Sequence, residues 1–308
     1  MIKSIIKRAL PFGFASVFGM IYFFIGSVML SKIKGDVEVA VYSVAFNIAL
    51  ALLFIPTVYT NAIYPVLSRY YDQSKSELKL LYEKSFKYLY IIGLPISLGL
   101  FLLAERIILS LYGNKYSASI IALKIISLYF VIKFINFLLG IVLSSIGKQN
   151  KRMLGQGLTA GLNILLNLFL IPMIGFVGAA LSTFITEIFL FIVYYLFVSK
   201  SWYFYNFLKI LSKPIIAVIV MVIFIKFTSF GLIITILLSA IIYFILLLIL
   251  RTFDKEDYGI IRRILKNEAL QKKARKMVKI ATSPSAMQPK FRLKNTKNGH
   301  FWLFLTFF

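Results

Sequence analysis

The feature that most constrains this sequence is a series of eight long apolar segments between residues 9 and 250. The hydrocarbon core of a bilayer is about 30 Å thick, so a helix needs about 20 residues to cross it. Backbone groups in lipid must bond to one another, and these segments are continuously apolar rather than alternating. We therefore predict membrane-spanning helices and not a barrel. The predicted spans are residues 9–31, 41–66, 86–104, 119–146, 153–173, 176–198, 210–228 and 230–250.

Composition supports an all-α, polytopic transmembrane helix bundle over residues 1–250. The chain is 60% hydrophobic, with a mean hydropathy of +0.88, which is outside the soluble range. Its 35 Lys and Arg against 11 acidic residues give a net charge of +24. In a soluble protein this charge would suggest nucleic acid. Here the charge lies mostly between and after the apolar segments, so the expected partner is anionic membrane lipid and no nucleic acid.

Signals for enzymatic chemistry are sparse. The chain has no cysteine and one histidine, His300, which excludes disulfides, thiolate catalysis and a Cys/His metal site. No G-x-x-x-x-G-K-[ST] phosphate loop is present. The acidic cluster of Asp254, Glu256 and Asp257 lies within a basic tail. We expect no catalytic residues, no bound metal and no cofactor, and instead movement of a substrate across or into the membrane.

The positive charges also predict an orientation. With the N-terminus inside, the first 250 residues place 14 Lys and Arg in inner segments and 5 in outer segments. Another 14 follow residue 250. Because Lys and Arg concentrate in short cytoplasmic loops, we predict a multi-pass protein of the cell membrane with both termini in the cytoplasm.

Three polar regions lie outside the spans. Residues 68–87 place Leu78, Tyr82 and Phe86 on one helical face, which predicts a short amphipathic helix on the inner membrane surface. Residues 251–282 form a basic segment with an apolar face, suited to an anionic leaflet or simply solvated. Residues 283–308 have the composition of a disordered tail.

Two ionisable residues, Lys133 and Glu187, lie near the centres of predicted spans. A charge there costs on the order of 3 kcal/mol, so such residues normally face the interior of the bundle. Helical spacing places further polar side chains on the same or neighbouring stripes. The predicted cavity-lining residues are Lys133, Glu187, Asn136, Tyr129, Asn163, Asn167 and Asn61.

Two interpretations of these stripes remain open. In one, they line a hydrated cavity in which Lys133 or Glu187 binds a charged substrate or couples to a proton or sodium ion. In the other, Lys133 and Glu187 neutralise each other and the asparagines hold helices together. Sequence spacing alone does not separate the two.

The order of several local patterns resembles a known family. These patterns are Ala9–Ser31, Lys34–Pro56, Tyr64–Tyr71, Leu81–Tyr116, Leu143–Arg152 and Asn163–Glu187. Each pattern is weak alone, but their order and spacing over residues 5–200 make the set specific. The series resembles the polysaccharide flippases of the multidrug/oligosaccharidyl-lipid/polysaccharide exporter superfamily.

The resemblance implies a transporter that moves a polyprenyl-diphosphate-linked glycan to the outer leaflet. Such proteins have two six-helix lobes around a cationic cavity, often followed by two extra helices. A positive cavity would screen the diphosphate while it crosses a region of low dielectric constant. Lys133 is the residue best placed for this role by the sequence.

The resemblance begins at what corresponds to the seventh helix of the family. Eight spans then match one lobe plus the extra pair. Since alternating access rocks one lobe against another, we expect a separate N-terminal lobe, a second copy of the chain, or a fragment of a longer transporter. The alternatives are a multidrug or small-molecule exporter of the same superfamily, and a non-transporting scaffold subunit or truncated remnant.

Overall fold

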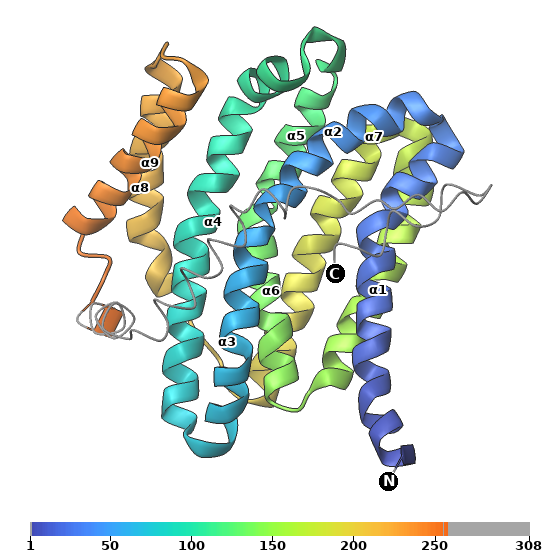
Figure 1. Cartoon of the computed structure of the whole chain (residues 1–308), viewed down its shortest axis with the longest axis vertical. Coiled ribbons are helices and arrows are strands. Elements are labelled where there is room, and N and C mark those ends of the chain that lie inside the picture. The colour runs from blue at the N-terminus through green and yellow to red at the C-terminus, as the bar shows by residue number, and fades with distance from the viewer. Residues whose placement is uncertain (1, 255, 258–308) are drawn as a thin grey trace, which may run out of the picture. The chain divides into compact units, whose positions relative to one another are not determined.

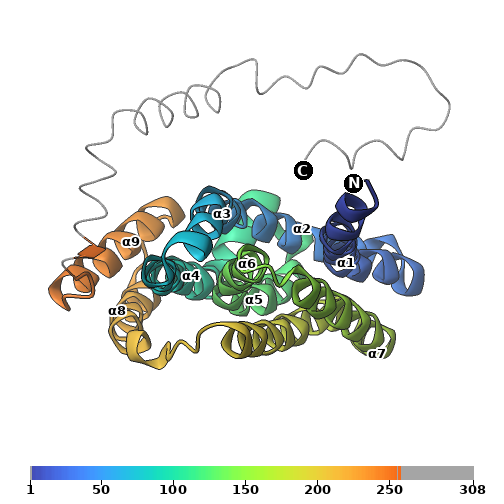
Figure 2. The ribbon, with the colours of Figure 1, turned by 90° about the horizontal axis from the view of Figure 1, so that it is seen from below.

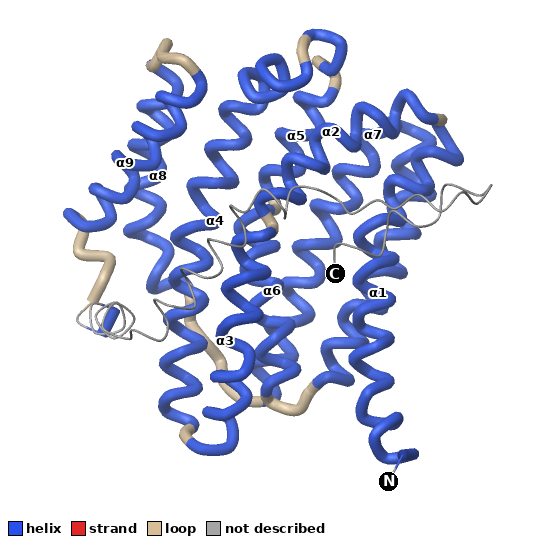
Figure 3. The backbone as a smooth tube through the Cα atoms, in the orientation of Figure 1, coloured by secondary structure: helices blue, strands red, loops and turns tan. Residues whose placement is uncertain are grey.

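The structure, a computed structural model, describes residues 2–254, 256 and 257. The chain divides into a unit of residues 1–252, which holds all the helices named below, and a second unit of residues 253–308. Within the described residues the regular elements are helices, with no strand (Figure 3). This confirms the all-α prediction. The predicted segments 251–282 and 283–308 lie outside the described residues, apart from the first few positions.

The helices follow one another with short connections. They are α1 (Ile2–Lys34), α2 (Asp36–Leu52), α3 (Phe54–Gln73), α4 (Lys75–Tyr112), a 3-10 turn (Asn114–Tyr116), α5 (Ser119–Leu128), α6 (Phe130–Ser145), α7 (Gln149–Ser201), α8 (Leu208–Phe227) and α9 (Leu232–Ile249). Figure 1 shows the chain running alternately up and down the bundle. The connections at 74, 146–148 and 202–207 therefore lie at one end, and those at 35, 113–118 and 228–231 at the other.

The helices form layers when seen along their axes. Figure 2 shows α4, α5 and α6 in the middle, with α2 and α3 on one side and the second half of α7 on the other, while α1 lies directly against α7. Helix α1 packs along α7, and α6 contacts both α3 and α7. Helices α8 and α9 pair with each other and pack against α4. The most central helix, α6, is buried along nearly its whole length.

Helix α7 is a helical hairpin rather than one rod. Its 53 residues would extend about 80 Å if straight. The backbone instead leaves the helical region at Ile174 (φ −133°) and Gly175 (φ 57°). A Cβ atom at Gly178 would lie 2.3 Å from the carbonyl oxygen of Leu170, eight residues earlier, which requires the chain to reverse. Gly175 fits this turn because glycine adopts a positive φ without steric cost.

The number of spans follows from this reversal. Six helical stretches in the described part of the chain are long and apolar enough to cross a membrane, and the pair α5–α6, bent by 46°, makes a seventh. The two halves of α7, residues 149–173 and 176–201, count separately because the chain turns back between them. The total of eight agrees with the sequence prediction.

The predicted amphipathic surface helix over residues 68–87 is wrong. Helix α3 continues to Gln73, and α4 begins at Lys75 and runs unbroken through the predicted third span. The hydroxyl of Ser74 caps this start by accepting a hydrogen bond from the backbone N–H of Glu77 at 3.4 Å. The apolar face was identified correctly, because Leu78 and Tyr82 are fully buried. That face packs into the bundle and not onto lipid.

Two predicted single spans are interrupted. Pro56 has no N–H for the carbonyl of Leu52, so α2 ends at Leu52 and α3 begins at Phe54. The predicted span 119–146 is divided at Tyr129, where α5 ends and α6 begins. Tyr129 is buried, with only 3% of its surface exposed. No proline or glycine marks this second break, so it could not be predicted from the residues around it.

Candidate functional site

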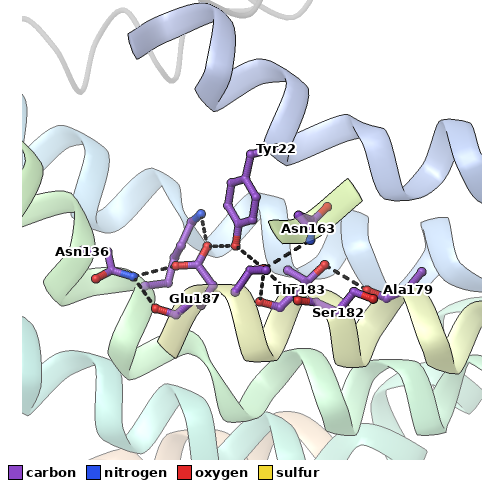
Figure 4. A network of polar contacts seen from close by, with 9 residues as sticks. Tyr22, Asn136, Asn163, Ala179, Ser182, Thr183 and Glu187 are labelled. Carbon is purple, nitrogen blue, oxygen red and sulfur yellow. Dashed lines mark hydrogen bonds and ion pairs between the residues drawn. The ribbon is translucent and has the colours of Figure 1, made fainter. Parts of the chain in front are cut away.

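A buried carboxylate, Glu187, is the centre of a polar network in the bundle (Figure 4). Its oxygen atom Oε1 accepts a hydrogen bond from the Tyr22 hydroxyl of α1 at 2.6 Å and forms an ion pair with Lys133 of α6. Its other oxygen, Oε2, accepts from the Asn136 side-chain amide at 2.8 Å. The Glu187 side chain is fully buried. Burial of a carboxylate is tolerated here because three donors from two other helices satisfy it.

Lys133 contacts a carboxylate and three aromatic rings in this network. Its ammonium group pairs with Glu187, and the rings of Tyr22, Phe23 and Phe137 lie 5.0, 5.7 and 5.9 Å from it. Only 11% of its side chain is exposed. Such rings attract a cation through their negative faces. Of the two interpretations left open by the sequence, mutual neutralisation of Lys133 and Glu187 is therefore the arrangement that the structure has.

Asn163 of α7 joins the two halves of the hairpin, and Asn167 supports it from the same half. The Asn163 amide donates to the Thr186 hydroxyl at 3.2 Å, and the Asn167 amide donates to the Asn163 carbonyl oxygen at 2.8 Å. Both asparagines are fully buried. Figure 4 shows Asn163 facing the second half of α7. In this structure Asn163 therefore joins helices, as polar side chains commonly do within membranes.

A polar cavity of about 170 Å³ lies between α3, α6 and α7. It is lined by side chains from all three helices. They are Thr57, Thr60 and Asn61 of α3, Lys133, Asn136, Phe137, Gly140 and Ile141 of α6, and Arg152, Gln156, Leu190 and Tyr194 of α7. Polar groups inside a spanning bundle mark hydrated or substrate-binding regions, so this cavity is the candidate functional site.

Arg152 is the cation of this cavity without an acidic partner among the described residues. One of its terminal nitrogens, Nη1, donates to the Ser144 hydroxyl at 3.0 Å, while its Nε is buried and has no partner. Lys133 also lines the cavity, but Glu187 balances its charge. The lining side chains and the carboxylate behind them thus leave one uncompensated positive charge.

Two glycines let Tyr194 complete the cavity wall. A Cβ atom on Gly155 would lie 2.6 Å from the Tyr194 ring, and one on Gly140 would lie 3.4 Å from it. The Tyr194 hydroxyl donates to the backbone oxygen of Arg152 at 3.3 Å. The ring therefore fixes the first turn of α7, from which Arg152 reaches the cavity.

The predicted site residues fall into two groups. Lys133, Asn136 and Asn61 line the cavity, whereas Glu187 lies behind Lys133, and Tyr129, Asn163 and Asn167 are buried elsewhere. Sequence reasoning missed Arg152 because it counted as an inner-loop charge. Helical spacing could have found it, since Arg152 precedes Gln156 by four residues and extends the stripe that leads to Asn163.

A multi-pass helical bundle with a polar cavity among its spans has the architecture of a membrane transporter. The sequence profile of the MatE family matches residues 11–169, just over half of the chain. The chain belongs to the MatE family. This confirms the resemblance to the exporter superfamily seen in the sequence.

Two relatives are similar in sequence at low identity. The capsular polysaccharide biosynthesis protein CapF of Staphylococcus aureus is 26% identical over 204 residues, which are 64% of this chain and 50% of CapF. The probable flippase AglR of Haloferax volcanii is 24% identical over 168 residues, which are 53% of this chain and 35% of AglR. The chain therefore spans half or less of the relatives that it matches.

Two solved structures share the fold. The lipid II flippase MurJ, in an inward closed conformation, superposes with a TM-score of 0.55 at 19% identity, over 71% of this chain and 51% of MurJ. A transporter of the MOP superfamily from Pyrococcus furiosus gives 0.56 at 23% identity, over 71% of this chain and 50% of that protein. The helical bundle described above therefore corresponds to about half of each transporter.

Proposed function

We propose that this chain is one half of a flippase that moves lipid-linked oligosaccharides across the cell membrane by alternating access. The observation that carries the proposal is the polar cavity between α3, α6 and α7, with an unpaired Arg152 in its wall. The names of the relatives CapF and AglR support the substrate class. The fold shared with MurJ supports the mode of transport.

The electrostatics of the cavity favour an anionic substrate. Coulomb attraction strengthens as the surrounding dielectric constant falls, so a guanidinium within the bundle attracts a phosphate more strongly than one in water. Lys133 contributes less, because its charge is already balanced by Glu187. We therefore assign the anion-binding role to Arg152 instead of Lys133. A guanidinium also suits phosphate because its donors are arranged as a planar fork.

Transport requires a second lobe. Alternating access moves one bundle against another around a shared site, and the relatives extend well beyond the region matched here. We propose that a separate N-terminal lobe, or a second copy of this chain, faces the α3 side of the cavity. Asn61 lines the cavity and is exposed, so it would then lie in the interface between the two lobes.

The proposal is tested by reconstitution. The chain is placed in vesicles, alone and together with a candidate N-terminal lobe, and transfer of a fluorescent lipid-linked oligosaccharide between leaflets is measured. Transfer should require the second lobe and should fall at least tenfold in Arg152→Gln. The matched control is Arg69→Gln, since Arg69 is exposed on α3 outside the cavity. Transfer that is unaffected by Arg152→Gln would contradict the assigned site.

A further inference from the structure

Three polar atoms at the cavity have no hydrogen-bond partner in the described structure. They are Nε of Arg152, Oε1 of Gln156 and Oδ1 of Asn136, and all three residues line the cavity. The first is a donor, and the other two are acceptors. Buried polar atoms without partners are costly, and such atoms normally meet water or a ligand. A ligand that satisfies all three must bring an acceptor and at least two donors, and the positive charge of Arg152 favours an anionic acceptor.

The orientation of Asn136 is fixed by its neighbour. Its amide nitrogen donates to both the backbone oxygen and the Oε2 of Glu187, at 3.0 and 2.8 Å. Turning the amide over would place its carbonyl oxygen against the carboxylate, so the nitrogen must face Glu187. Asn136 is 4% exposed. Its unpartnered oxygen is therefore a built-in acceptor and not a freely rotating group.

The donor and the two acceptors belong to residues that line the same cavity. Gln156 follows Arg152 by four residues on α7, so their side chains leave the same face. The Nε of Arg152 lies 3.6 Å from the position of a Cβ on Gly140. Gly140 in turn follows Asn136 by one helical turn on α6. The guanidinium thus lies against α6, one helical turn from Asn136, and lines the same cavity as both amides.

The threonines of the wall add acceptors. The Thr57 hydroxyl donates to the backbone oxygen of Leu53, and the Thr60 hydroxyl donates to that of Pro56, both at 2.7 Å. With their hydrogens used within α3, both oxygens can only accept from the cavity. A polyprenyl phosphate or diphosphate is mostly ionised at neutral pH, because its last pKa is about 6, so it offers few donors to these groups. A sugar carries several hydroxyls, each of which is a donor.

We propose that the cavity binds the junction of a glycosyl phosphate, with the phosphoryl oxygens at Arg152 and the hydroxyls of the attached sugar donating to Gln156 Oε1 and Asn136 Oδ1. This inference rests on the proposed function and adds to it the residues that recognise the first sugar. It predicts that the site prefers a lipid diphosphate that carries a sugar over the same lipid without one. A lipid diphosphate without its sugar would leave the amide oxygens unpaired, and a site built to hydrogen-bond a hydroxyl discriminates strongly against its absence.

The test measures binding and needs no second lobe. The full-length chain in detergent is titrated with two fluorescent probes, a polyprenyl diphosphate and the same lipid carrying one sugar. The wild-type chain should bind the glycosylated lipid about tenfold more tightly, the value of one or two buried hydrogen bonds. In Gln156→Met, which keeps the side-chain length but lacks the acceptor, this ratio should fall to about two. Arg152→Gln should weaken the binding of both lipids and leave the ratio near its original value.

A matched control and a folding check accompany these variants. Gln73→Met removes a glutamine that is exposed at the end of α3, and it should leave the ratio unchanged. Size-exclusion profiles and helical circular dichroism should match the wild type for every variant. Equal affinity of the wild type for both lipids, or an unchanged ratio in Gln156→Met, would overturn the inference and leave the proposed function standing. A wild type that binds neither lipid would overturn both.

Discussion

The Tyr243 hydroxyl of α9 donates a hydrogen bond at 2.9 Å to the backbone oxygen of Ile91 in α4. In a regular helix this oxygen would accept from the residue four positions later, which here is Pro95 and has no N–H. The proline thus leaves a carbonyl free in the apolar region, and a tyrosine from another helix satisfies it. The bond fixes the C-terminal helix pair to the rest of the bundle.

This relationship predicts a thermodynamic coupling between Tyr243 and Pro95. Tyr243→Phe should lower stability by about 1 to 2 kcal/mol, because it leaves a buried carbonyl unpaired. In a Pro95→Ala background the new N–H supplies the missing donor, so the same substitution should cost much less. Thermal unfolding of the four variants in detergent gives the coupling. Equal costs in both backgrounds would show that the bond is unimportant.

The Lys133–Glu187 pair predicts non-additive substitutions. Glu187→Gln leaves an unbalanced ammonium group in a mostly buried position and should destabilise the chain by about 3 to 5 kcal/mol. Adding Lys133→Met removes that charge, while glutamine still accepts from Tyr22. The double variant should therefore be more stable than Glu187→Gln alone. The measurement is the midpoint of thermal unfolding, and a double variant that is less stable would contradict the ion pair.

Gly155 and Gly161 of α7 form a matched pair. A Cβ on Gly155 would meet the Tyr194 ring at 2.6 Å, whereas one on Gly161 would meet nothing within 4 Å. Gly155→Ala should cost about 1 to 3 kcal/mol through overpacking. Gly161→Ala should be neutral or stabilising by up to about 1 kcal/mol, because alanine favours the helix. Unfolding midpoints that shift in the same direction would contradict the close packing at Tyr194.

The α7 hairpin predicts a short distance between two distant positions. Leu158 and Ile192 are about half exposed and lie on opposite arms, 16 residues before Ile174 and 17 residues after Gly175. If α7 were straight, they would be about 50 Å apart. Neighbouring helices pack with axes about 8 to 10 Å apart, so spin labels at these positions should report less than half of the straight-helix distance. Pulsed electron resonance on the double-labelled chain makes the measurement.

The orientation predicted from Lys and Arg is directly testable, because the chain contains no cysteine and single cysteines can be introduced without background. Gln73 and Asn150 lie at one end of the bundle, and Asn114 and Ser229 at the other, all of them exposed. Cysteines at Asn114 and Ser229 should react with an impermeant reagent added outside intact cells. Those at Gln73 and Asn150 should react only after lysis. The reverse pattern would place the termini outside.

Much of the fold follows from segment length alone. Apolar runs long enough to cross lipid gave the correct helices, and the break between α2 and α3 follows from Pro56, which has no N–H. The break at Tyr129 could not be foreseen, because no proline or glycine lies near it. The face of Leu78 and Tyr82 was correctly identified as apolar. Only the structure shows that this face packs against protein and not against lipid, because the same helical periodicity is expected in both cases.

The sequence predicted a polar site inside the bundle, but it did not predict which residues pair with each other or which cation faces the cavity. Helical spacing placed Lys133 and Asn136 on one face, yet it could not show that Glu187 reaches Lys133 from another helix. Pairing across 54 residues depends on how three helices pack. Arg152 was passed over because its position at the start of α7 made it a loop charge. Its long side chain reaches across to α6, where Nη1 donates to the Ser144 hydroxyl, and a contact with another helix cannot be read from a span boundary.

The exact balance of charge between Lys133 and Glu187 has an electrical consequence. A membrane voltage pulls on net charge, with an energy of about 2.3 kcal/mol for each elementary charge carried across 100 mV. A lysine and a glutamate that move together contribute nothing to that work. Among the cavity-lining side chains, the field acts instead on the positive charge of the Arg152 guanidinium. A bound anion would offset that charge. The occupied and empty forms of the site should therefore respond differently to voltage.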